Sequence, residues 1–226
     1  MKRFAGWVLV LGLLALIGCS GVPQGYWPVI PSPVTQKAKP QKVCIRMEGK
    51  EAQRYTLKLS LYPSKLAFKC VRPDMDYEIK KYVRSELSDF KEVYFLGEKD
   101  KVPPGCYLVT LSWEDSYRSY IKGGVGLFGK TYVVGGRIKG TLVGKKGTYD
   151  CSVVGWDLVP EKDMSSPDAY VCKDAPIEVF FDRVAGQLAQ KMALRVRKAL
   201  LEDMGYTPSP QLVQADEKMS RELKEW

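Results

Sequence analysis

The chain has 226 residues, with 35 lysines and arginines against 26 acidic residues and no histidine. This length suits one domain of ordinary size with appendages, and it is enough to bury a core. The lack of histidine excludes Ser–His and Cys–His catalytic arrangements and removes the commonest metal ligand. The net charge of +9 fits an anionic partner such as lipid headgroups or cell-wall carboxylates, or serves solubility alone.

The first residues join a basic head to an apolar run. Lys2 and Arg3 precede Phe4 to Ile17, a stretch without charge. This run is too short for a membrane span, which needs roughly 20 residues. A basic head, a short apolar run and the small residue Gly18 are typical of a secretory signal peptide.

The end of this run, Leu16-Ile17-Gly18-Cys19, resembles the lipobox of bacterial lipoproteins. The resemblance implies that residues 1–18 are a signal peptide removed before Cys19, and that Cys19 carries the lipid, palmitate included. Ser20 stands where an Asp typically holds lipoproteins in the inner membrane. The resemblance therefore implies an outer-membrane lipoprotein that faces the periplasm.

Residues 19–41 are expected to form a lipidated, proline-rich tether. Five prolines lie in it, at positions 23, 28, 31, 33 and 40. Proline at this density opposes helix and sheet and favours an extended chain. Fully extended, such a tether reaches roughly 60–70 Å at about 3.1 Å per residue.

Residues 42–205 are expected to fold as an α+β periplasmic domain. Arg54 to Tyr62 alternates apolar and polar residues, as a half-buried strand does. Similar patterns predict strands over 43–47, 65–71, 93–96, 106–120, 137–143 and 148–158. We predict an antiparallel sheet of five to seven strands, with two helices packed on one face and a further amphipathic helix at the C-terminus.

The helices have recognisable starts and stops. The first is predicted from Asp74 to Phe90, with Asp74 or Asp76 as its cap. The second runs from Asp174 to Met204 and stops at Gly205. Its apolar stripe is expected to pack on the sheet, opposite a polar side made by Asp182, Gln187, Gln190, Arg195, Arg197 and Lys198.

The C-terminal tail, 206–226, contains a predicted helix that begins after Ser209. Apolar residues recur at helical spacing from Leu212 to Trp226. Two interpretations are open: the tail docks on its own domain, or it docks on a partner.

The centre of the chain is rich in glycine. Gly124 to Thr131 matches the P-loop pattern G-x-x-x-x-G-K-[ST], but a P-loop must be followed by a helix. Strand-like residues follow Thr131, so we predict no nucleotide site and interpret the match as a loop between strands. Gly136, Gly140 and Gly144 share one face of a strand, where a helix or another subunit could lie close.

Five cysteines remain beside Cys19. The periplasm is oxidising, which favours disulfides. The predicted pairs are Cys151–Cys172 and Cys44–Cys70, which leaves Cys106 free; buried free thiols are the alternative. No C-x-x-C motif is present, so a zinc ribbon or thioredoxin-type site is not expected.

The element order strand–helix–strands–helix over roughly residues 43–205 is similar to that of small periplasmic lipoprotein domains, including those of the CsgG and TolB N-terminal type. The similarity rests on element order alone, and any function taken from it is analogy.

The sequence as a whole favours a non-enzymatic binding or scaffold module, anchored by lipid to the outer membrane and contacting an envelope protein or the cell wall. No catalytic, metal or cofactor residues and no nucleic-acid or nucleotide partner are predicted. One alternative is a subunit of an oligomeric secretion or pore assembly that pairs through the hairpin 122–144. The other is a cell-wall or lipid hydrolase, which would need a convergent pair among Glu92, Glu98, Asp100, Glu114 and Asp115.

Overall fold

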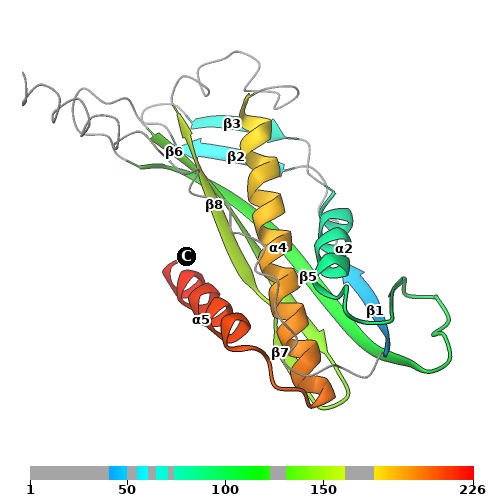
Figure 1. The fold of residues 1–226 in the computed structure, drawn as a ribbon. Helices are drawn as coiled ribbons and strands as arrows, with labels where there is room; N and C mark the ends of the chain where they lie inside the picture. The colour runs from blue at the N-terminus through cyan, green and yellow to red at the C-terminus, as the bar shows by residue number, and fades with distance from the viewer. Residues whose placement is uncertain (1–40, 50–54, 61–64, 71–73, 123–130, 161–175) are drawn as a thin grey trace, which may run out of the picture.

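A computed structural model describes residues 41–49, 55–60, 65–70, 74–122, 131–160 and 176–226. The predicted signal peptide, Cys19, most of the tether and Cys172 lie outside these ranges. Eight strands are described: β1 (Lys42–Gly49), β2 (Tyr55–Ser60), β3 (Lys65–Cys70), β4 (Glu92–Leu96), β5 (Cys106–Lys122), β6 (Thr131–Val143), β7 (Thr148–Asp150) and β8 (Val153–Pro160). The helices are α2 (Met75–Glu86), α4 (Pro176–Met204) and α5 (Pro210–Glu225) (Figure 1).

Six of the strands form one sheet, in which β4, β1, β5 and β6 are neighbours in that order and β6 also pairs with β7 and β8. The predicted α+β class is confirmed. The sheet is mixed rather than antiparallel, because β1 pairs in parallel with both β4 and β5. Helix α2 carries the chain back between β1 and β4, and such a crossover makes the two strands parallel.

The core lies between one face of this sheet and the helices. Strand residues on that face, including Ile45, Leu111 and Ile138, have no exposed surface. They form one cluster with residues from α2, α4 and α5. Figure 1 shows α4 crossing the sheet, with α2 on one side of it and α5 on the other.

The predicted helix caps are confirmed, but the first helix, α2, ends at Glu86 and not at the predicted Phe90. The Asp74 carboxylate accepts a hydrogen bond from the backbone N–H of Tyr77 at 2.9 Å, so Asp74 caps α2. Ser209 caps α5 in the same way. Gly205 ends α4 with φ of +85°, a conformation that glycine adopts without a steric cost.

The glycines of β6 lie beneath α4, as one of the two interpretations predicts. A Cβ on Gly136 would come within 2.7 Å of the Leu188 side chain, and one on Gly140 within 2.8 Å of Met192. A Cβ on Gly144 would overlap the Asp203 carboxylate. Helix α4 therefore approaches the sheet this closely only because these strand residues have no side chains.

Of the polar side predicted for α4, Asp182 is exposed and Lys198 half-buried, but the other four residues are buried. Lys191, Arg195 and Arg197 keep 3–4% of their surface exposed, and Gln187 and Gln190 keep 8%. The prediction failed because α5 and the end of α2 cover this side of the helix with acceptor groups.

None of the helices in the described ranges is long and apolar enough to cross a membrane.

Candidate functional site

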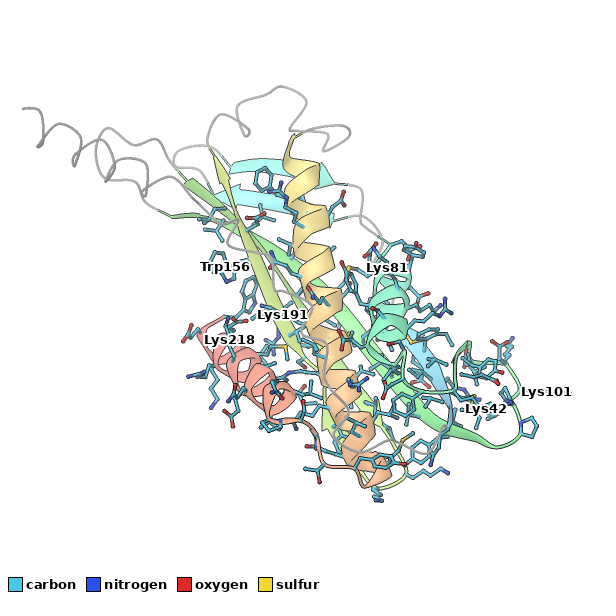
Figure 2. The ribbon with its side chains drawn as sticks, viewed as in Figure 1. Lys42, Lys81, Lys101, Trp156, Lys191 and Lys218 are labelled. Atoms are coloured by element: carbon cyan, nitrogen blue, oxygen red, sulfur yellow. A yellow bond between two sulfur atoms is a disulfide. The ribbon has the colours of Figure 1, made fainter. Side chains whose placement is uncertain are left out.

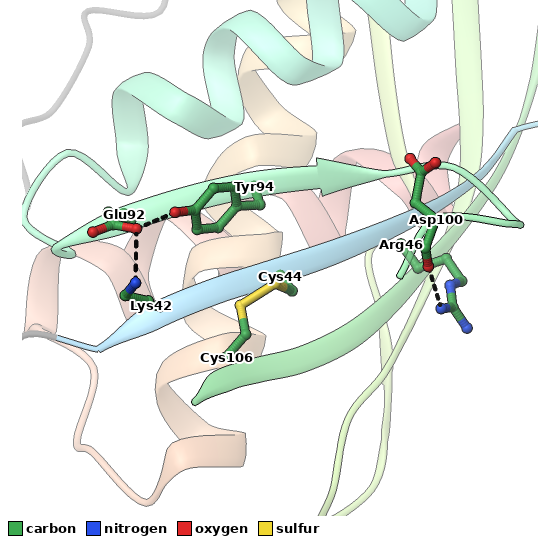
Figure 3. The surroundings of a disulfide bond; sticks show 7 residues. All are labelled: Lys42, Cys44, Arg46, Glu92, Tyr94, Asp100 and Cys106. Atoms are coloured by element: carbon green, nitrogen blue, oxygen red, sulfur yellow. Dashed lines mark hydrogen bonds and ion pairs between the residues drawn. A yellow bond between two sulfur atoms is a disulfide. The ribbon is translucent and has the colours of Figure 1, made fainter. Parts of the chain in front are cut away.

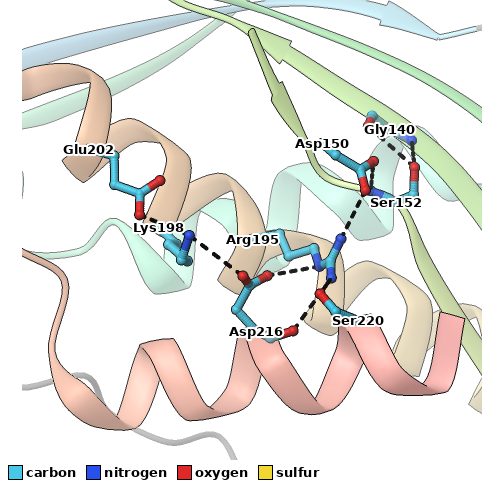
Figure 4. Close-up of polar contacts among 8 residues, drawn as sticks. All are labelled: Gly140, Asp150, Ser152, Arg195, Lys198, Glu202, Asp216 and Ser220. Carbon is cyan, nitrogen blue, oxygen red and sulfur yellow. Dashed lines mark hydrogen bonds and ion pairs between the residues drawn. The ribbon is translucent and has the colours of Figure 1, made fainter. Parts of the chain in front are cut away.

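Buried cations on α4 hold the C-terminal helix in place (Figure 4). The Arg195 guanidinium lies 3.0 Å from the Asp216 carboxylate of α5 and 3.2 Å from Asp150 at the end of β7. Lys198 reaches the same Asp216 at 3.5 Å. These pairs join three elements, because Arg195 supplies several donors in a fixed geometry.

A second contact between α4 and α5 lies about one turn before Arg195. The Lys191 ammonium donates to the Val154 carbonyl of β8 and to Glu222 of α5, each at 2.7 Å. Burial lowers the pKa of Lys191, and the hydrogen bond to Glu222 acts in the opposite direction. Together with the buried residues Leu212 and Met219, these contacts dock α5 on its own chain.

On the opposite side, Arg197 ties α4 to the end of α2. Its guanidinium lies 2.6 Å from the Asp89 carboxylate and also donates to the Glu86 carbonyl. The sequence pattern placed Arg195 and Arg197 on the polar side of the helix but did not predict their burial, since a charged stripe on a helix usually marks a solvated face. It did not single out Lys191. The sequence signal for this burial was the pair of acids Asp216 and Glu222, which lie next to the apolar stripe of α5. Acids beside an apolar stripe can pair with cations of the helix on which that stripe packs.

The end of α4 closes on the turn between β6 and β7. The fully buried Asp203 carboxylate accepts hydrogen bonds from the Tyr107 hydroxyl at 2.6 Å and from the backbone N–H groups of Lys145 and Lys146 at 2.8 and 2.7 Å. Tyr149 donates to it at 3.2 Å. Burial alone would raise the pKa of Asp203, but these donors lower it overall. We call this arrangement the Asp203 clasp.

The clasp fixes the backbone of two exposed lysines, Lys145 and Lys146. Their backbone N–H groups are both bound to Asp203, and the Lys145 ammonium lies 4.6 Å from the centre of the Tyr107 ring. The turn 144–147 is further closed by a hydrogen bond from Gly144 N–H to the Gly147 carbonyl, at 2.9 Å. Lys145 and Lys146 therefore project from a turn that is held on both sides.

The disulfide joins Cys44 to Cys106, so the predicted Cys44–Cys70 pair is wrong. Cys44 lies on β1 and Cys106 begins the adjacent β5, on the same face and two positions out of register. Their Cα atoms are 5.8 Å apart, a distance that a disulfide spans. Figure 3 shows the bond close to Lys42, which pairs with Glu92 at 3.3 Å.

Cys151 is a buried free thiol, so the predicted Cys151–Cys172 pair is also wrong. Burial raises the pKa of this thiol to about 12. Since the thiolate is the reactive form, Cys151 is a core residue and not a nucleophile.

The remaining candidates do not converge on a catalytic site. β6 begins at Thr131, so a strand follows the P-loop match where a helix is needed. Glu92 pairs with Lys42, Asp100 accepts from the Gly97 N–H in the loop after β4, and Asp115 is buried on the helix-covered face. In the described part of the chain, no group of His, Cys, Asp and Glu could hold a metal ion.

The face of the sheet opposite the helices carries short polar side chains. Register places Thr110, Ser112 and Glu114 of β5 beside Val143, Thr141 and Lys139 of β6. Lys139, Thr141 and Val143 are exposed, Val143 by 45%. We call these six residues the open face. It is a flat surface with hydroxyl groups and charges of both signs.

No family model matches the chain, and no curated protein matches its sequence. Solved structures with some similarity include a minor lipoprotein from Acinetobacter baumannii, 10% identical over 70% of this chain and 92% of that chain, with a TM-score of 0.43. Another is a Helicobacter pylori protein provisionally named a homologue of a neuraminyllactose-binding hemagglutinin, 11% identical over 88% and 98%, with a TM-score of 0.37. A third, from Caulobacter crescentus CB15, is provisionally named a lipoprotein and is 10% identical over 68% and 93%, with a TM-score of 0.32. Identities and scores at this level carry no argument about activity or ligand.

Proposed function

We propose that the chain is a lipid-anchored lipoprotein of the bacterial outer membrane that acts as a non-enzymatic binding or scaffold module facing the periplasm. The lipobox at Cys19 supports the anchor. The observation that carries the proposal is the Cys44–Cys106 disulfide, which lies at the start of β1, where the predicted tether joins the domain. Disulfides persist in oxidising compartments, and this one ties the tethered strand to the centre of the sheet.

The surface best suited to a partner is the open face. The opposite face is filled by helices, whose polar groups are used within the chain by Arg195, Lys191 and Arg197. The open face offers hydroxyls and charges in fixed positions on paired strands. Rigid strands hold such groups more precisely than loops do.

The alternative of an oligomer paired through residues 122–144 has less support. In the described part of this hairpin, β6 is already paired with β5 on one edge and with β7 and β8 on the other. Its glycines, the other place where a subunit could lie, are covered by α4. A second subunit would have to displace that helix from the core.

Site-specific photocrosslinking in intact cells tests the proposal. A photoreactive residue at Thr141 samples the open face, and the same residue at Gln214 samples the exposed side of α5 as a matched control. We expect adducts with an envelope protein or with cell-wall material from position 141 and not from position 214. A protein that gives no adduct from position 141, although it folds and reaches the envelope, would contradict the proposal.

A further inference from the structure

One end of the domain gathers exposed lysines. β4, β1 and β5 are parallel and begin at the same level, where Lys42 is in register with Glu92 and Cys106. Figure 3 shows these three residues together at that end. Lys91 immediately precedes β4, and the contact of Lys145 with Tyr107 brings the β6–β7 turn to the same level. We call Lys42, Lys91, Lys145 and Lys146 the basic end.

The acids near the basic end are already paired. Glu92 pairs with Lys42, Asp89 with Arg197 and Glu202 with Lys198. Asp203 is buried in its clasp. Lys91, Lys145 and Lys146 are exposed and form no ion pair with any acid in the described ranges. With Lys42 balanced by Glu92, the basic end sets three lysines against the single Asp203 carboxylate and keeps a net positive charge over about 14 Å, the spacing of four adjacent strands.

Two further features distinguish this end from scattered surface lysines. Val143, one of the exposed large apolar residues, directly precedes the turn that carries Lys145 and Lys146. β1 also begins here, so the chain between Cys19 and the domain arrives at this end. A lipid on Cys19 would keep the basic end near a bilayer at high effective concentration.

We infer that the basic end is a membrane-contact surface, in which Lys91, Lys145 and Lys146 bind the anionic headgroups of the bilayer that holds the lipid anchor. This inference rests on the proposed anchor. Each lysine near an anionic surface strengthens binding, and the Asp203 clasp holds the backbone of two of them in place. Contact at this end would turn the open face sideways and leave it accessible to a periplasmic partner.

Lysine modification in vesicles tests the inference. Lipidated protein is reconstituted into phosphatidylcholine vesicles with or without phosphatidylglycerol, treated with a water-soluble acetylating reagent and mapped by mass spectrometry. We expect acetylation of Lys91, Lys145 and Lys146 to slow several-fold only in the anionic vesicles, while Lys139 and Lys224 are unchanged. Salt at 1 M should remove the difference, because it shortens the screening length to about 3 Å. Equal rates in both vesicles, or protection of Lys139 and Lys224 instead, would overturn the inference.

Flotation of the same vesicles separates this outcome from a failure of the anchor. Protein that floats but shows no protection contradicts the basic end alone. Protein that does not float contradicts the anchor, and the basic end is then tested by adding purified protein to preformed anionic vesicles. There Lys145→Gln/Lys146→Gln should lower partitioning roughly 30-fold. Lys81→Gln/Lys224→Gln changes the net charge equally at exposed positions, Lys81 lying away from Lys42 (Figure 2), and should have little effect. Equal losses from both variants would overturn the inference.

Discussion

At the scale of single residues, Asp203 links the end of α4 to two segments that are far from it in the sequence, β5 and the β6–β7 hairpin. Its carboxylate binds the Tyr107 hydroxyl of β5, the turn at 145–146 and Tyr149 of β7. A buried carboxylate with this many donors is stabilising only while it is ionised. The sequence gives no sign of it, because Asp203 looks like one more charge in the last turn of a helix.

Replacing Asp203 with Asn should lower the free energy of unfolding at pH 7 by about 2–3 kcal/mol, because the amide cannot accept from all these donors. Tyr149→Phe, which removes one donor, should cost about 1 kcal/mol. Urea denaturation measures both. If Asp203→Asn costs no more than Tyr149→Phe, the clasp does not stabilise the fold as described.

The clasp also predicts that the stability of the fold depends on pH in the acid range. Its donors hold the pKa of Asp203 below its usual range, whereas the unfolded chain has the ordinary value of about 3.9. The contribution to stability is therefore complete above about pH 5, one unit above the unfolded pKa, and is lost as pH falls through the lower folded value. The difference in unfolding free energy between wild type and Asp203→Asn should shrink between pH 5 and pH 3, values set by that unfolded pKa of about 3.9. A difference that stays constant would contradict the assignment.

The disulfide gives a second prediction at this scale. Cys44 and Cys106 are 62 residues apart, and a loop of that length corresponds to about 4 kcal/mol in the chain-entropy account. Cys44→Ala and Cys106→Ala should each destabilise the protein by this order, and the double variant by little more. Mass spectrometry of unreduced peptides should recover Cys44 with Cys106. Recovery of Cys44 with Cys70 would contradict the structure.

At the scale of elements, the approach of α4 to β6 depends on glycine. Gly144→Ala should cost about 2–3 kcal/mol, because the new methyl group would push Asp203 away from the turn. Gly147→Ala is the matched control in the same turn, since a Cβ there meets nothing closer than 3.8 Å. Thermal unfolding of the two variants measures the difference. Equal melting temperatures would show that the turn is not packed against α4.

Helix α5 is held by ion pairs as well as by apolar contacts. Asp216→Asn leaves the almost fully buried Arg195 with a weaker partner and should speed amide hydrogen exchange in α5 several-fold, while the sheet keeps its protection. Glu217→Gln changes the neighbouring exposed acid and should have little effect. If both variants leave exchange in α5 unchanged, the ion pairs do not hold the helix.

Most helices and strands could be predicted from the sequence, but the way the strands pair in the sheet could not. Alternation in β2 and the cap at Asp74 are local signals, so both were predicted correctly. The parallel pairing of β1 and the partner of Cys44 depend on where α2 returns the chain, which no local pattern encodes. The burial of Arg195 was not predicted for the same reason, because it depends on the docking of α5.

At the scale of the whole molecule, the account describes a domain with different surfaces for different tasks. The helix face is internal, the open face is proposed to bind a partner, and the basic end is proposed to meet the membrane. The two proposed roles rest on the proposed lipid at Cys19, which would hold the domain at the bilayer that the basic end is proposed to meet.

Metabolic labelling with a palmitate analogue tests this dependence most directly. Wild-type protein should carry the label and fractionate with the outer membrane, and Cys19→Ser should carry none, with Cys151→Ser as a labelled control. An unlabelled wild-type protein, or a Cys19→Ser variant that keeps the label, would contradict the account.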